Sequence, residues 1–182
     1  MVFSRPEIAP YLHDGNVECW LASDGTNRDP AHADFWRASP DAQFFLMRGY
    51  QEDAHASDGV EPGHIFDLTL PAWRMGEVLL HAASMAEKFQ VPQARVVMVV
   101  RWAGLDGRRL ASWANPNRLL FDGHRSRQAI YRTNISVRAD QVVDALPELV
   151  DKLVRPLYEL FDFFQISNTL VAEELARMRG AG

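Results

Sequence analysis

Nine arginines lie between residues 95 and 138, accompanied by only two acidic residues, and they are the side chains best suited to binding an anion. A guanidinium presents a planar pair of N–H donors that matches two phosphate oxygens, and arginine is favoured over lysine for this geometry. We therefore expect an anionic ligand, either a nucleotide or a nucleic acid, with Trp113 and Tyr131 offering stacking surfaces. The expected ligand-binding residues are Arg101, Arg108, Arg109, Arg125, Arg127, Arg132, Arg138 and Asn134.

The charge along the chain supports this hypothesis and also an alternative to it. Residues 1–94 carry six basic and 14 acidic residues, a net charge of −8, whereas residues 95–138 carry a net charge of +7 and residues 139–182 a net charge of −4. Such polarity steers an anionic partner toward the basic segment. In the alternative, the arginines pair with the acidic flanks of the same chain, which is then a structural or dimerisation module of a larger prokaryotic protein.

A second group of residue types suited to chemistry lies on and around a polar loop at 52–64. Carboxylates and imidazoles on one loop can bind a divalent ion or act as acid and base, which leaves a metal-dependent enzyme as a further alternative. Their spacing matches no known metal motif, and the only lysines, Lys88 and Lys152, fall on expected helices rather than on a strand beside the loop. The candidate metal ligands are Glu52, Asp53, His55, His64 and Asp67.

No phosphate-binding loop, dinucleotide fingerprint, zinc-protease motif or nucleophile elbow occurs in the sequence. This absence weighs against the common nucleotide hydrolases, dinucleotide enzymes and hydrolases. We therefore expect no cofactor, and a binding, sensor or regulatory role rather than catalysis.

The elements that must position these residues follow from hydrophobic periodicity. Residues 1–42, rich in proline and glycine, predict an irregular arm with one short strand, and 43–51 predict the first clear strand. A helix follows from about Thr69 to Val91, and then a strand at 95–102 that is apolar on both faces and hence expected to be central and covered on both sides. A turn at 104–107 leads to a strand at about 109–114, and residues 128–138 alternate between an apolar and a polar face.

Residues 139–182 predict helices, with Asp140 as an N-cap, breaks or kinks at Pro147 and Pro156, and a last helix near 168–177. Together these elements predict one α+β domain over 1–182, comprising the arm, a sheet with the first helix at 43–138, and the C-terminal helices. The sheet is expected to be mostly antiparallel, of about four to five strands, with helices packed on one face.

The length of 182 residues fits a single domain, and the lone cysteine, Cys19, excludes a disulfide framework. No apolar run is long enough to span a membrane, and no signal peptide is present, so we expect a cytoplasmic protein without a membrane partner. The bulky apolar stripe at 157–164 is wider than one packing face needs, which favours a homodimer.

Four runs of the sequence are similar to those of a known group of bacterial proteins. They are 44–53 (FFLMRGYQED), 71–83 (PAWRMGEVLLHAA), 102–113 (WAGLDGRRLASW) and 149–163, which contains the step Arg155-Pro156-Leu157-Tyr158. Residues 36–165 resemble the C-terminal accessory region of bacterial proteins that carry a Schlafen/AlbA-like DNA-binding domain in front. The resemblance implies a sensor or dimerisation module in a nucleic-acid-associated or defence-related protein, and it assigns no functional residue, because the front domain has no counterpart in this chain.

Overall fold

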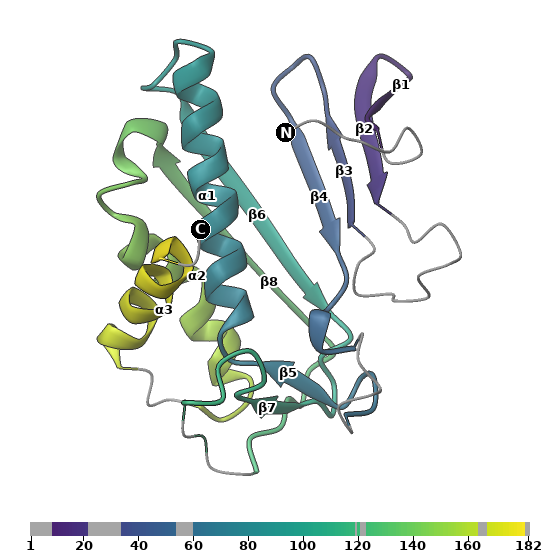
Figure 1. The fold of residues 1–182 in the computed structure, drawn as a ribbon, viewed down its shortest axis with the longest axis vertical. Helices are drawn as coiled ribbons and strands as arrows, with labels where there is room; N and C mark the ends of the chain where they lie inside the picture. Colours follow the sequence, from purple (N-terminus) through teal and green to yellow (C-terminus); the bar gives the residue numbers. More distant parts are fainter. Residues whose placement is uncertain are drawn as a thin grey trace. The chain divides into compact units, whose positions relative to one another are not determined.

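The chain reverses direction at Asp14 and Gly15, which both have positive φ, 47° and 76°, in the computed structural model. Two adjacent residues of this kind form the tight turn that suits antiparallel strands, so a hairpin forms where the sequence predicted an irregular arm. That prediction is wrong for the described part of 1–42. The structure describes residues 9–21, 34–53, 60–118, 120, 123–163 and 167–180 (Figure 1).

The chain divides into two compact units, Met1–Ile65 and Phe66–Gly182. The prediction of a single domain stays a prediction. The first unit contains a four-stranded antiparallel sheet in the order β1-β2-β3-β4, and the strand expected at 43–51 is its last strand. Its elements are β1 (Tyr11–His13), β2 (Asn16–Leu21), β3 (Asp34–Ala38), β4 (Phe44–Arg48) and the 3₁₀ turn η3 (Gln51–Asp53).

Two small sheets belong to the part of the chain that follows. In one of them β6 (Arg95–Ala103) pairs antiparallel with β8 (Ile130–Arg138) over nine residues each. In the other, β5 (Ile65–Asp67) pairs with β7 (Arg109–Ala111). In the turn between β6 and β7, Gly104 and Gly107 both have a φ of 72°. The Asp-Gly pair at 106–107 indicated such a turn.

The strand at 95–102 is not covered on both sides, so that prediction is wrong. Among the described strands β6 pairs with β8 alone, and Val97 and Val99 are 64% and 75% exposed. An apolar run shows that a strand is hydrophobic but not what covers it, because that depends on elements distant in sequence. The exposed valines leave an open sheet face.

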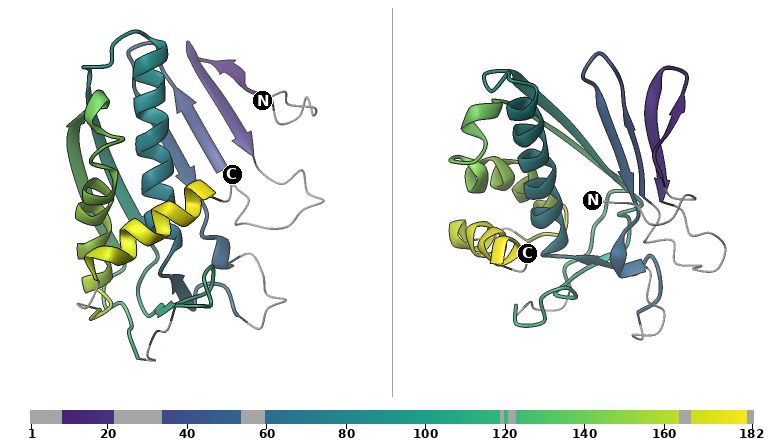
Figure 2. Two further views of the ribbon diagram at one scale, coloured as in Figure 1. Left: turned by 60° about the vertical axis from the view of Figure 1, so that its left-hand side comes forward. Right: turned by 45° about the horizontal axis from the view of Figure 1, so that its top comes forward.

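Three helices complete the second unit, α1 (Leu70–Lys88), α2 (Leu146–Glu159) and α3 (Asn168–Gly180). They lie on one side of the β6–β8 pair, as Figure 2 shows. Asp140 does not cap a long helix as predicted, because it lies in the 3₁₀ turn η5 (Ala139–Gln141). The helix α2 begins later, at Leu146, with Pro147 in its first turn, where a missing N–H leaves no intrahelical bond unmade, and Pro156 lies inside it.

The start of α1 is fixed by a buried carboxylate. Asp67 is fully buried, and its Oδ1 accepts hydrogen bonds of 2.7 Å from the backbone N–H groups of Thr69 and Leu70. Its Oδ2 accepts the N–H of Ala114 at 2.8 Å. These bonds satisfy N–H groups that a helix start leaves without intrahelical partners, and they hold the segment after β7 against α1. Burial, the largest influence, raises the pKa of Asp67 above its ordinary value.

The helices pack through small and aromatic residues. A Cβ atom at Gly76 of α1 would lie 2.5 Å from Cδ2 of Leu175, so this glycine permits a close approach of α3. Leu157, Tyr158 and Phe161 are fully buried within one chain, so this part of the apolar stripe does not itself require a second copy. The fold class is α+β, as predicted, but the strands expected to form one sheet belong to three, which contain β4, β7 and the β6–β8 pair. The homodimer stays a prediction.

Candidate anion-binding face

Alternation along β6 and β8 divides their side chains between two faces. In β8 the side chains of Tyr131, Thr133 and Ile135 are half-buried and Val137 is buried, whereas every second residue is exposed. The alternation predicted for this strand is therefore confirmed. We call the exposed side the outer face. It consists of Arg95, Val97, Val99, Arg101 and Ala103 on β6, and Ile130, Arg132, Asn134, Ser136 and Arg138 on β8.

The strand register places arginine residues opposite each other near both ends of this face. Arg95 is paired with Arg138, and Arg101 is paired with Arg132. Directly opposed residues of antiparallel strands have Cβ atoms about 5 Å apart. Because six residues separate the arginines along each strand, the two pairs lie about 20 Å apart. None of the ten residues of the outer face is acidic.

The two arginine pairs differ in their partners. Within the described residues, neither Arg101 nor Arg132 forms an ion pair or hydrogen bond through its side chain. At the other end, Arg138 Nε donates to Asp140 at 3.1 Å, and this hydrogen bond raises the pKa of Arg138. Arg95 Nη1 donates to the hydroxyl of Ser136 at 3.2 Å. Arg101 and Arg132 are thus the guanidiniums most available to a ligand.

Three of the predicted arginines lie elsewhere, in β7 and in the loops that flank it. Arg108 is 5% exposed, and its Nε donates to the carbonyl oxygen of Gly104 at 2.7 Å. Arg125 forms an isolated backbone bridge with Arg109, and its Nη1 donates to the carbonyl of Gly107 at 2.9 Å. The structure therefore does not bring the whole predicted set together, because these guanidiniums close the turn instead.

Two further arginines of the basic segment pair with carboxylates of the C-terminal region. Arg127 is exposed and lies 3.3 Å from Asp162. Arg118 contacts Glu173 at 2.8 Å and the buried Glu174 at 2.7 Å, which fastens the loop after β7 to α3. The alternative hypothesis, in which arginines pair with the acidic flanks, describes these two residues well.

Neither of the two expected stacking residues belongs to the outer face, and Trp113 lies in the segment after β7. Tyr131 lies on the inner side of β8 and stacks on Trp102, with ring centroids 5.8 Å apart. Trp102 is only 8% exposed. No aromatic residue is among the ten of the outer face, so the role expected for Tyr131 is corrected: its ring packs on Trp102 on the inner side.

The candidate metal ligands do not form a cluster within the described residues, where no group of three suitable side chains occurs. Glu52 is buried in η3, and Asp53 Oδ1 accepts the N–H of Gly63 at 2.8 Å. The exposed His64 pairs with Glu61 at 3.3 Å, and Asp67 is occupied by backbone N–H groups. His55 lies outside the described residues.

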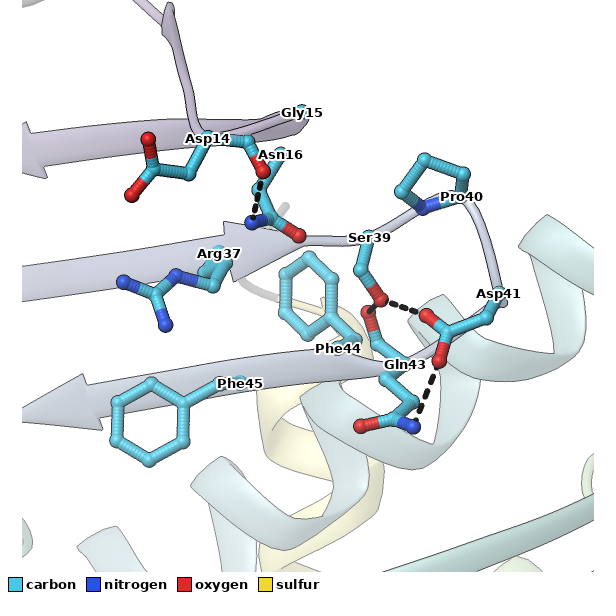
Figure 3. Close-up of a pocket in the computed structure, with 10 residues that line it drawn as sticks. All are labelled: Asp14, Gly15, Asn16, Arg37, Ser39, Pro40, Asp41, Gln43, Phe44 and Phe45. Atoms are coloured by element: carbon cyan, nitrogen blue, oxygen red, sulfur yellow. Dashed lines mark hydrogen bonds between the residues drawn. The ribbon is translucent and has the colours of Figure 1, made fainter.

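A shallow concavity lies at one end of the sheet in the first unit, where the β1–β2 and β3–β4 turns meet (Figure 3). Its polar atoms are bonded mainly to one another. Asp41 accepts hydrogen bonds from Ser39 and, at 2.8 Å, from Gln43, while Arg37 Nε donates to Glu18 at 2.6 Å. Because these groups hold the two turns in place, we assign no ligand to the concavity.

Comparisons of the chain with family models, with curated proteins and with solved structures found no match. The resemblance to the accessory region of Schlafen/AlbA-like proteins stays a prediction. No helix in the described part of the chain is long and apolar enough to span a membrane.

Proposed function

We propose that the chain is a non-enzymatic binding module whose outer face holds a ligand with several phosphates, as in a nucleic acid. The observation that supports this most directly is the exposed pairing of Arg101 with Arg132, neither of which forms an ion pair with a carboxylate of the described residues. Like charges directly opposite each other destabilise a sheet, so the pair is unfavourable for folding alone. An anion between the two guanidiniums replaces that repulsion with two charge-assisted contacts.

The length of the outer face favours a polymer over a single nucleotide. The two arginine pairs are about 20 Å apart, six residues along each strand. A nucleotide carries its phosphates in one short group and reaches one pair at a time. The phosphates of a nucleic acid recur along the whole backbone, so one molecule contacts the arginine pairs at both ends of the face.

Binding of labelled 20-nucleotide oligonucleotides and of ATP, measured by fluorescence anisotropy in low salt, tests this proposal. The double variant Arg101→Ala/Arg132→Ala removes the unpaired guanidiniums. Its matched control is Arg177→Ala/Arg179→Ala, which removes the same charge from the exposed end of α3.

We expect oligonucleotide binding to weaken about 100-fold between 50 and 200 mM salt if four phosphate contacts are made. The outer-face variant should lose affinity and its logarithmic salt slope should fall by about two, whereas the control should stay near wild type. Failure of every oligonucleotide to bind at low salt, or equal losses in the two variants, would overturn the proposal.

A further inference from the structure

The middle of the outer face differs chemically from its ends. Between the two arginine pairs, Val97 lies opposite Ser136, and Val99 lies opposite Asn134. The side chains of Val99 and Asn134 are exposed, and no aromatic ring lies among them. Exposed valines contribute nothing to a purely electrostatic surface. The central valines and Asn134 therefore favour a ligand with apolar and hydrogen-bonding groups between its phosphates.

The absence of aromatic residues from the outer face bears on which nucleic acid fits. Proteins that bind single strands stack the bases on aromatic side chains. Here Trp102 and Tyr131, the residues next to Arg101 and Arg132 in the two strands, stack on each other on the inner side of the sheet. In a duplex the bases stack on one another, so a protein can bind it without aromatic side chains on its surface.

We infer that the outer face inserts into the major groove of duplex DNA as a two-stranded ribbon, an inference that rests on the proposed function. The major groove of B-DNA is about 12 Å wide and admits a two-stranded antiparallel ribbon. The face is such a ribbon, nine residues long on each strand. The 20 Å between its arginine pairs corresponds to about six base pairs of duplex.

The side chains of the face match the groups that the major groove displays. The amide of Asn134 has the donor and acceptor that pair with the N6 and N7 atoms of adenine, and the methyl groups of Val97 and Val99 suit the methyl group of thymine. The arginine pairs at the two ends contact phosphates. Asn134 is accordingly the base-reading residue, and Arg101 and Arg132 supply affinity without sequence preference.

The same geometry excludes duplex RNA as an equal ligand. The major groove of A-form RNA is deep and narrow, and side chains cannot read it. We therefore expect at least tenfold weaker binding to duplex RNA than to duplex DNA of the same sequence. Single-stranded DNA should also bind at least tenfold more weakly, since it offers phosphates but no groove.

The experiment uses the full chain and four probes: duplex DNA, duplex RNA and single-stranded DNA of 20 nucleotides, and polyphosphate. Selection from a randomised duplex DNA pool then compares wild type with Asn134→Ala and with the control Asn117→Ala, an exposed asparagine in the turn after β7. We expect Asn134→Ala to flatten the selected sequence preference while the salt slope of binding stays unchanged, and the control to behave as wild type.

The outcomes separate this inference from the function on which it rests. Equal affinity for all four probes, or an unchanged sequence preference in Asn134→Ala, overturns groove reading and leaves polyanion binding standing. No binding to any probe overturns both. If light scattering instead finds a dimer that Val99→Ser dissociates, and no probe binds, the outer face is an interface between two copies and both proposals fail.

Discussion

Replacing Arg132 by glutamate separates a functional role of the outer face from a structural one. Arg132 lies directly opposite Arg101, both side chains are exposed, and neither forms an ion pair within the described residues. The variant Arg132→Glu converts a cross-strand repulsion into an attraction. If the arginines serve folding, the substitution lowers stability. If they serve a ligand, it raises stability and weakens binding.

The size of the stability change follows from the cross-strand geometry. Opposite charges that face each other contribute about 0.2–1 kcal/mol, and like charges cost a similar amount. Because both side chains are exposed and screened by solvent, the combined gain is about 0.5–1 kcal/mol, less a few tenths for the poorer strand preference of glutamate. For a chain of this size that corresponds to a rise in Tm of about 2 °C.

Thermal unfolding followed by circular dichroism measures this change, with Arg132→Gln as the neutral control of similar length. We expect the Tm to increase in the order wild type, glutamine variant, glutamate variant at low salt, and the differences to shrink at 1 M salt, where the screening length is about 3 Å. Oligonucleotide affinity should fall in the same order. A lower Tm for Arg132→Glu, with unchanged binding, would refute this reasoning and favour the structural hypothesis.

Three further substitutions test the packing that supports the face. Gly76→Ala should destabilise the fold by about 1 kcal/mol in urea unfolding, because the strain against Leu175 outweighs the gain in helix propensity. Tyr158→Phe should cost about 1 kcal/mol by the same measurement, since the hydroxyl donates to the buried carbonyl of Leu68 at 2.5 Å. The raised pKa of Asp67 means that the folded chain keeps this proton at a pH where the unfolded chain has lost it, so stability relative to Asp67→Asn should fall as the pH rises above about 4; a flat difference between pH 3 and 7 would contradict the assignment.

The fold could be predicted from the sequence wherever the signal was local. The alternation at 128–138 correctly indicated one exposed and one buried side of β8, and the helix expected from about Thr69 corresponds to α1, which begins at Leu70. The hairpin at Asp14-Gly15 was missed, although it carries the same dipeptide that identified the turn at 106–107, because the prolines around it suggested irregular chain. What covers β6 could not be predicted, since coverage is set by distant elements.

The candidate site, like the fold, could be predicted only where the signal was local in the sequence. Arg95, Val97, Val99 and Arg101 are alternate residues of one strand, so the sequence indicated that all four share a face. That alternation would have added Arg95 to the expected site. The loss of Arg108 to the carbonyl of Gly104 had no such signal. The sequence alone does not distinguish an arginine that bonds within a turn from one that faces solvent, because the difference arises only when the turn folds.

The outer face therefore depends on the strand register of β6 and β8 as much as on the number of arginines in the two strands. The helices α1 and α2 occupy one side of β6 and β8, so only alternate residues of each strand reach solvent (Figure 2). A slip of one residue would turn Arg132 inward and Thr133 outward, and burying an unpaired guanidinium beside the helices would cost several kcal/mol. The packing of Val137 and Trp102 on the inner side thus stabilises the one register in which the arginines face each other, which is why a charge arrangement unfavourable in itself persists in a well-packed sheet.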